Sequence, residues 1–216
     1  TIVPPAPPEW GMPPRGLLTA PGRYTVSMSI ERAGEVTQVG APQPFDVVPL
    51  RSGALPGSPS EVAAKFWRSY EQAVRDHTAM TVAVAGMLAQ SKRMAAVLEH
   101  TQAAAGATLD RDVTALRRQL LDLETRLNGD RSRQEPGEKH APTIQSRLFS
   151  VELGVAQATY GPTGTHRRQL EIVRQQLDEL RPMLDEHAKQ VSALVRRLIE
   201  AGAPWLEGQP LPGSGR

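Results

Sequence analysis

The sequence contains no cysteine, which excludes disulfide bonds and thiolate metal ligands and leaves the redox compartment open. Aromatic side chains make up only 4% of the residues, too few to favour the stacking platforms that bind single-stranded nucleic acid. Long apolar runs are also missing, so we expect no membrane span. The net charge is only +2, and basic and acidic residues are interleaved. This pattern is typical of a solvated surface and disfavours a nucleic-acid partner.

Residue combinations that carry chemistry are scarce as well. No Ser-His-Asp or paired-carboxylate arrangement can be assigned, so we name no catalytic, cofactor-binding or metal-binding residue. The segment Gly161-Pro-Thr-Gly-Thr-His166 has a superficial likeness to a phosphate-binding loop. It lacks the lysine and the spacing of a GxxxxGKS/T motif, and no strand precedes it. A turn between two helices is the better interpretation of these six residues. We expect the chain as a whole not to be an enzyme.

The first 59 residues are expected to contain three parts. Residues 1–16 are rich in proline, which predicts an extended lead-in; Trp10 either anchors it or lies in a loosely packed tail. Residues 17–50 form a β-segment, because apolar and polar side chains alternate from Tyr24 to Ile30 as in a half-buried strand. We expect a hairpin turn at Ala33-Gly34, a return strand from Val36, and another strand at 45–48. Residues 51–59 are a linker rich in glycine, proline and serine.

Three short strands are too few for a stable sandwich. Either the lead-in donates a strand, or the rest of the β-domain precedes Thr1. Because the chain opens on Thr1 without a methionine, we interpret it as a fragment or a processed product.

Residues 60–202 are expected to form a helical bundle, followed by a tail at 203–216. Apolar residues recur at steps of three and four from Leu170 to Leu198, which predicts one apolar stripe along a long helix. Similar stripes predict helices over about 60–105, 109–128 and 142–160, with the last helix over 165–201 and kinked at Pro182. In the helix over 60–105 the predicted stripe is Trp67, Tyr70, Val74, His77, Thr81, Val84, Leu88, Ser91, Ala95 and Leu98. In the helix over 109–128 it is Leu109, Val113, Leu116, Leu120, Leu123 and Leu127. The fold class is therefore α+β, mostly α. A small antiparallel β-segment precedes an elongated antiparallel four-helix bundle. In this bundle two short helices pack against the half of the two long helices that is far from the β-segment.

Two histidines fall on the apolar stripes. His77 and His187 lie in the two long helices, which we expect to run antiparallel, so the pair could titrate near neutral pH or share a metal. Metal sites in bundles usually need carboxylates at helical spacing, such as a Glu-x-x-His repeat, and none is present. We therefore favour a core or register-setting role.

The remaining candidates for interaction are tryptophans and a charged loop. Arg131 and Arg133 lie in a polar loop that is either a solvated connection or a site for a partner's carboxylates. Together with Trp10, Trp67 and Trp205 and the two histidines, they are our interaction candidates.

Two stretches resemble a known family. The sequence Pro21-Gly-Arg-Tyr-Thr-Val26, followed by Phe45-Asp-Val-Val48, resembles the closing strands of an immunoglobulin-like module. This module occurs in bacterial BNR/Asp-box β-propeller proteins, which are similar to sortilin (VPS10) ectodomains and are often labelled glycosyl-hydrolase-like. The segments 125–130 and 142–148 are similar to the helical tail that follows the module. The chain departs from the pattern at Val48-Pro-Leu-Arg51, where Asp-Pro-Arg is usual, and it has no Asp-box.

The resemblance implies a non-catalytic C-terminal scaffold or interaction region. Its partner would be the upstream β-propeller of the same protein or a processed partner chain, or a second copy through self-association. It also implies an extracellular or periplasmic location and no cofactor. Two alternatives stay open. The region could be a substrate-binding accessory part of a glycosidase-like hydrolase, binding saccharide through its tryptophans. It could also be an adaptor for acidic partners.

Overall fold

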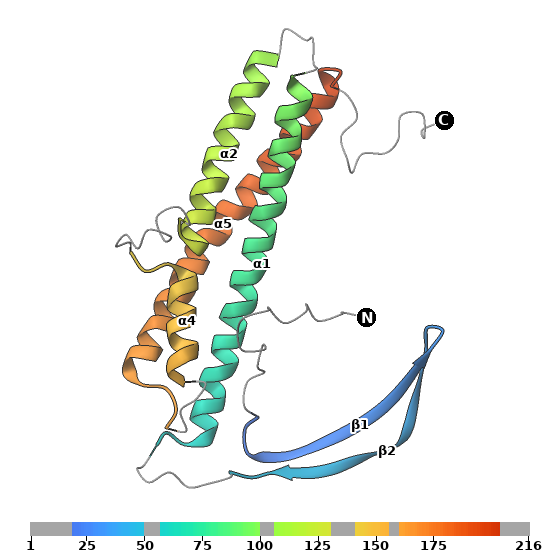
Figure 1. The fold of residues 1–216 in the computed structure, drawn as a ribbon, viewed down its shortest axis with the longest axis vertical. Coiled ribbons are helices and arrows are strands. Elements are labelled where there is room, and N and C mark those ends of the chain that lie inside the picture. The colour runs from blue at the N-terminus through green and yellow to red at the C-terminus, as the bar shows by residue number, and fades with distance from the viewer. Residues whose placement is uncertain (1–18, 50–56, 100–105, 131–140, 156–159, 204–216) are drawn as a thin grey trace, which may run out of the picture. The chain divides into compact units, whose positions relative to one another are not determined.

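A computed structural model describes residues 19–49, 57–99, 106–130, 141–155 and 160–203 (Figure 1). The described chain is mostly helical, with four helices and a two-stranded antiparallel sheet, as the sequence predicts. It divides into two compact units. Unit 1 comprises residues 1–69 and 152–167, and unit 2 comprises residues 70–151 and 168–216.

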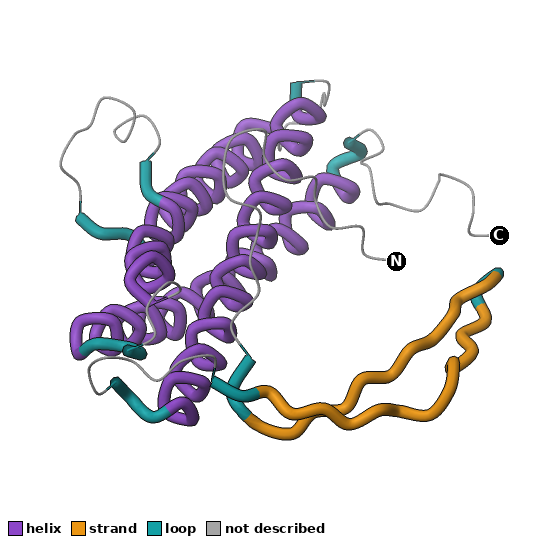
Figure 2. The backbone as a smooth tube through the Cα atoms, turned by 60° about the horizontal axis from the view of Figure 1, so that its bottom comes forward, coloured by secondary structure: helices purple, strands orange, loops and turns teal. Residues whose placement is uncertain are grey.

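The sheet is a hairpin of β1 (Gly22–Arg32) and β2 (Glu35–Val47), and Figure 2 shows these as two long paired strands. The turn is at the expected Ala33-Gly34, where both residues have positive φ, of 51° and 85°. This is the signature of the type I′ turn, whose twist matches that of the flanking strands. The hairpin therefore follows from local sequence.

The return strand differs from the expectation. A separate strand at 45–48 is wrong, because β2 runs unbroken from Glu35 to Val47. The register shifts between the pairs Val26–Gln43 and Met28–Val39, so that β2 carries extra residues around Gly40, whose φ is +72°. The glycine permits a bulge within one strand where the sequence suggested a break between two. The expected half-burial is also wrong, because nearly every side chain of the hairpin is exposed.

The helices are α1 (Ser60–Leu98), α2 (Gly106–Asn128), α4 (Ile144–Val155) and α5 (Gly164–Glu200), two long and two short as expected. Within unit 2, three contacts order the short helices along α5. Arg197 lies 2.7 Å from Asp112, Arg126 donates to the Met183 sulfur, and Arg147 donates to Gln169. Going along the chain from α2 to α4, the contacts therefore move from the end of α5 toward its start. The short helices follow one another in the same direction and do not form an adjacent antiparallel pair.

The long helices of unit 2 also differ from the expectation. Asp76 of α1 lies 3.7 Å from Arg181 of α5, and both helices run from bottom to top in Figure 1. They are parallel, so the predicted antiparallel pairing of the long helices is wrong, and the described contacts do not confirm a four-helix bundle. The lengths of the helices explain the parallel direction. The 23 residues of α2 and the 12 of α4 together nearly match the 37 of α5, so the two short helices run back along α5 as one interrupted helix would. After this single return, α5 runs in the same direction as α1.

The core of unit 2 is built from the apolar stripes. Every predicted stripe position of α2 is buried, from Leu109 to Leu127. On α1 the prediction is half right. Tyr70, His77, Val84, Ser91 and Leu98 are buried, but the second row is Ala73, Met80, Met87 and Met94 rather than the residues one position later. Both rows repeat every seven residues, as in helices that pack along a common axis.

Candidate interaction site

The exposed face of the hairpin is the feature most in need of explanation. Strand alternation and register place one set of side chains on the same face. We call it the apolar face, and its apolar members are Tyr24, Val26, Met28, Ile30, Val39, Phe45 and Val47. Gln43 and Thr37 lie on the same face, opposite Val26 and Ile30. Val26 is 55% exposed and Met28 61% exposed. The opposite face is mainly polar, with Arg23, Ser27, Ser29, Gln38 and Asp46.

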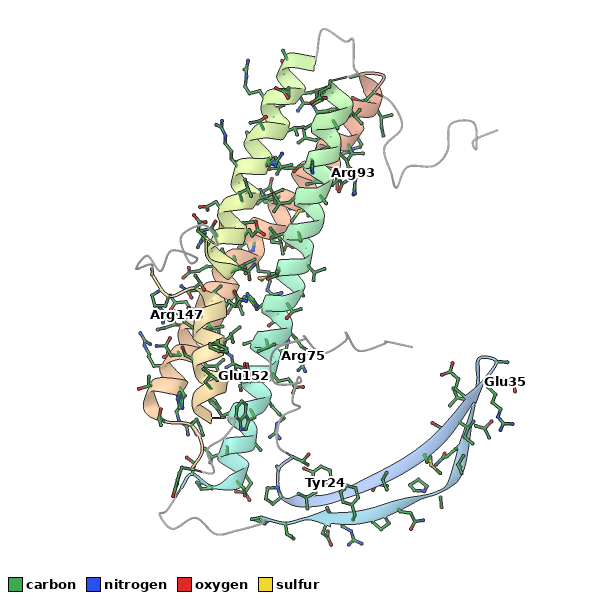
Figure 3. All side chains as sticks on the ribbon, in the orientation of Figure 1. Tyr24, Glu35, Arg75, Arg93, Arg147 and Glu152 are labelled. Atoms are coloured by element: carbon green, nitrogen blue, oxygen red, sulfur yellow. The ribbon has the colours of Figure 1, made fainter. Side chains whose placement is uncertain are left out.

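Tyr24 fixes the start of the hairpin. Its hydroxyl donates a 2.8 Å hydrogen bond to the carbonyl of Ala20, four residues upstream, and its ring stacks on Phe45 at a centroid distance of 5.9 Å. Figure 3 shows Tyr24 near one end of the hairpin and Glu35 at the turn. A tyrosine that bonds back to the backbone a few residues upstream is the arrangement of the tyrosine corner in immunoglobulin-like sandwiches. The sequence predicted the strand but not this hydrogen bond, although the Pro-Gly-x-Tyr spacing was visible.

The two edges of the hairpin differ. β2 carries Pro42 and Pro44, which have no N–H to donate, and the bulge at Gly40 further disrupts it. β1 has eleven residues and no proline. Among the described residues, β1 pairs only with β2, so its second edge has no strand partner there. The face and the β1 edge together form the candidate interaction site, which we call the hairpin site.

His77 lies in the core of unit 2 and forms a small polar cluster. It hydrogen-bonds with the backbone of Leu127 and the side chain of Asn128, and the Thr81 hydroxyl lies 3.4 Å from the Asn128 oxygen. Within the described part of the chain, its Nε2 has no hydrogen-bond partner. Burial lowers the pKa of His77 below its usual value of 6.5, and the two hydrogen bonds oppose this shift. The cluster ties α1 to the end of α2.

His187 is buried separately, with Nδ1 3.2 Å from the Gln190 side-chain oxygen. Because α1 and α5 are parallel and Asp76 lies beside Arg181, His187 is offset from His77 by about five residues, roughly 8 Å along the axis. The structure does not bring the two histidines face to face. The described residues contain no group of three or more His, Asp or Glu side chains that could hold a metal.

The remaining interaction candidates are the tryptophans and the two arginines of the charged loop. Trp67 is only 7% exposed and lies edge-on to Phe66, so its ring is part of the core of unit 1. Trp10, Trp205, Arg131 and Arg133 lie outside the described residues.

Unit 2 also contains a cavity of about 460 Å³. Its lining includes Arg126, Thr143 and Gln176, and the buried side-chain oxygen of Gln176 has no partner among the described residues. Two other lining residues, Asp130 and Ala141, border residues outside the described part of the chain. We therefore assign no ligand to this cavity.

None of the described helices has a stretch long and apolar enough to cross a membrane. Compared with protein-family models, with curated proteins and with solved structures, the chain gives no significant match.

Proposed function

We propose that this chain is a non-catalytic scaffold and interaction region at the C-terminal end of a larger β-propeller protein. In this proposal the hairpin is the end of an immunoglobulin-like module, and the helices are the tail that follows it. The region packs on the propeller or associates with itself, outside the cell or in the periplasm.

The exposed apolar face of the hairpin supports an interaction role most strongly. A two-stranded hairpin is at best marginally stable in water, and three or more strands with an apolar face, or packing against a helix, are needed for independent stability. Apolar side chains grouped on one exposed face are typical of a surface that binds another protein. The hydrogen bond from Tyr24 to Ala20 supports the immunoglobulin-like part of the proposal.

The accessory role in a saccharide-cleaving enzyme is less well supported. That alternative binds saccharide through the tryptophans, and Trp67, the one tryptophan among the described residues, is buried beside Phe66. The proposed role therefore predicts that saccharides leave the tryptophan fluorescence unchanged.

Binding of this chain to the β-propeller part of the same polypeptide tests the proposal. We compare Val26→Lys with Val82→Lys by calorimetry and sedimentation, because both valines are exposed but only Val26 lies on the apolar face. We expect Val26→Lys to weaken propeller binding or self-association at least about tenfold, because a lysine on this face must be desolvated. We expect Val82→Lys to change neither. Equal effects of the two variants, or no association of the unaltered chain at all, would contradict the proposal.

A further inference from the structure

The β1 edge that has no strand partner among the described residues presents backbone groups at alternate positions. In an antiparallel pair, opposed residues alternate between hydrogen-bonded and non-bonded pairs. Pro44 has no N–H, so the Thr25–Pro44 pair belongs to the non-bonded kind, and the backbone groups of Thr25 point away from β2. The period of two along β1 then directs the N–H groups of residues 23, 25, 27, 29 and 31 outward. They form a row of donors and acceptors ready for another strand.

The β1 sequence is complementary to itself. When a second β1 lies antiparallel with Ser27 opposite Ser27, Arg23 faces Glu31 of the second copy, and Glu31 faces Arg23 of the second copy. In the same register Tyr24 faces Ile30, and Val26 faces Met28. Opposite charges and apolar pairs directly across two antiparallel strands stabilise their pairing.

Other registers lose this match. A slip by one residue places apolar side chains of one strand opposite polar side chains of the other. A slip by two residues restores the apolar pairing but moves Arg23 away from Glu31 of the second copy. The charges therefore select the register centred on Ser27.

We propose that the β1 edge binds the β1 edge of a second copy of this chain, forming a four-stranded antiparallel sheet around a twofold axis. The inference rests on the proposed function, of which it specifies the self-association route. The outer edges of such a sheet are the two β2 strands. Their prolines and bulges prevent further strand addition, so the assembly ends at two copies. A sheet of four strands also exceeds the three strands needed for independent stability, which a single hairpin does not reach.

The direct test compares two prolines placed opposite each other. Ser29 and Gln38 form a non-bonded pair, so Ser29→Pro removes an outward N–H from the β1 edge and Gln38→Pro removes one from the β2 edge. Neither substitution removes a hydrogen bond between β1 and β2. By sedimentation over a wide concentration range, we expect Ser29→Pro to raise the dimer Kd at least about tenfold, and Gln38→Pro to leave it nearly unchanged.

Charge reversal tests the register. Glu31→Arg places two like charges opposite each other twice in the dimer, while its partner inside the hairpin is the uncharged Val36. We expect a several-fold increase in Kd that shrinks at high salt. Glu200→Arg makes the same charge change at the end of α5 and serves as the control.

The outcomes separate this inference from the proposed function. A chain that binds the propeller but stays monomeric at every concentration overturns the inference alone, as do equal effects of Ser29→Pro and Gln38→Pro. Hydrogen exchange supplies a further criterion. Protection of the outward β1 amides must rise with concentration, and protection that is the same at every concentration shows that another segment of the chain covers the edge, which also overturns the inference.

Discussion

At the scale of single residues, Gly161 holds a position that other residues cannot adopt without strain. Its φ is +79°, and a Cβ at this position would lie 2.8 Å from the Cβ of Ser58, whose N–H donates to the carbonyl of Tyr160. We expect Gly161→Ala to destabilise unit 1 by about 1–3 kcal/mol, because both the backbone and the contact with Ser58 must shift.

Gly164 provides the matched control for this change. It begins α5, and nothing lies within 4 Å of the position of an added Cβ. We expect Gly164→Ala to be neutral or slightly stabilising, because alanine favours helix. Urea unfolding of the two variants measures the difference, and equal stabilities would contradict the argument.

His77 predicts a pH dependence of stability with a definite sign. Burial lowers its folded-state pKa below 6.5, against the opposing effect of its hydrogen bonds to Leu127 and Asn128, so the folded chain resists protonation. Above the unfolded-state pKa both states are neutral and the stability does not change. As the pH falls through about 6.5, only the unfolded chain takes up the proton, so the free energy of unfolding falls until the lowered folded-state pKa is reached.

Urea titrations of the unaltered chain and of His77→Gln at about pH 7.5 and pH 5 measure this effect. We expect the unaltered chain to lose more stability on acidification than the variant does. Identical losses would show that the titration of His77 does not contribute.

At the scale of elements, the sequence predicted individual helices better than their packing. The six stripe positions of α2 were predictable because the spacing of the row leaves only one adjacent large apolar residue, Leu121, which lies off the row and is 44% exposed. On α1, Met80, Met87 and Met94 compete with Thr81, Leu88 and Ala95 at adjacent positions. Both rows have helical spacing, and only packing against neighbours decides which is buried.

The order of the short helices could not be predicted for a different reason. Whether α4 doubles back beside α2 or continues its direction depends on the conformation of the polar segment between Asn128 and Ile144, and composition does not encode that path. The same limit applies to the hairpin. Residues Gly40-Ala-Pro42 are suitable for a turn or for a bulge, and the pairing of both flanking segments with β1 selects the bulge.

The candidate site was predictable only in part. Alternation from Tyr24 to Ile30 indicated an amphipathic strand, but its exposure and the difference between the two edges depend on the register with Pro44. His77 and His187 were correctly placed on apolar stripes, but the parallel direction of α1 and α5 offsets them along the axis. The type of each side chain can be read from the local sequence. The topology of the fold decides which side chains contact one another.

At the scale of the whole molecule, the stability of the helices should depend on residues other than those that form the hairpin site. Leu120 of α2 is completely buried, whereas Tyr24 is half-buried and most other side chains of the apolar face are exposed. We expect Leu120→Ala to lower the free energy of unfolding by about 2–5 kcal/mol and to lower the Tm of the helices, because it leaves a cavity.

Tyr24→Ala breaks the hydrogen bond to Ala20 and the stacking on Phe45. We expect it to weaken association while the helical Tm shifts by only about 2 °C or less. Thermal unfolding followed by helical circular dichroism measures both effects, at a concentration low enough to keep the chain monomeric. If Tyr24→Ala lowered the helical Tm as much as Leu120→Ala, the hairpin would be a support for the helical core, and its exposed face could not be interpreted as a surface reserved for binding.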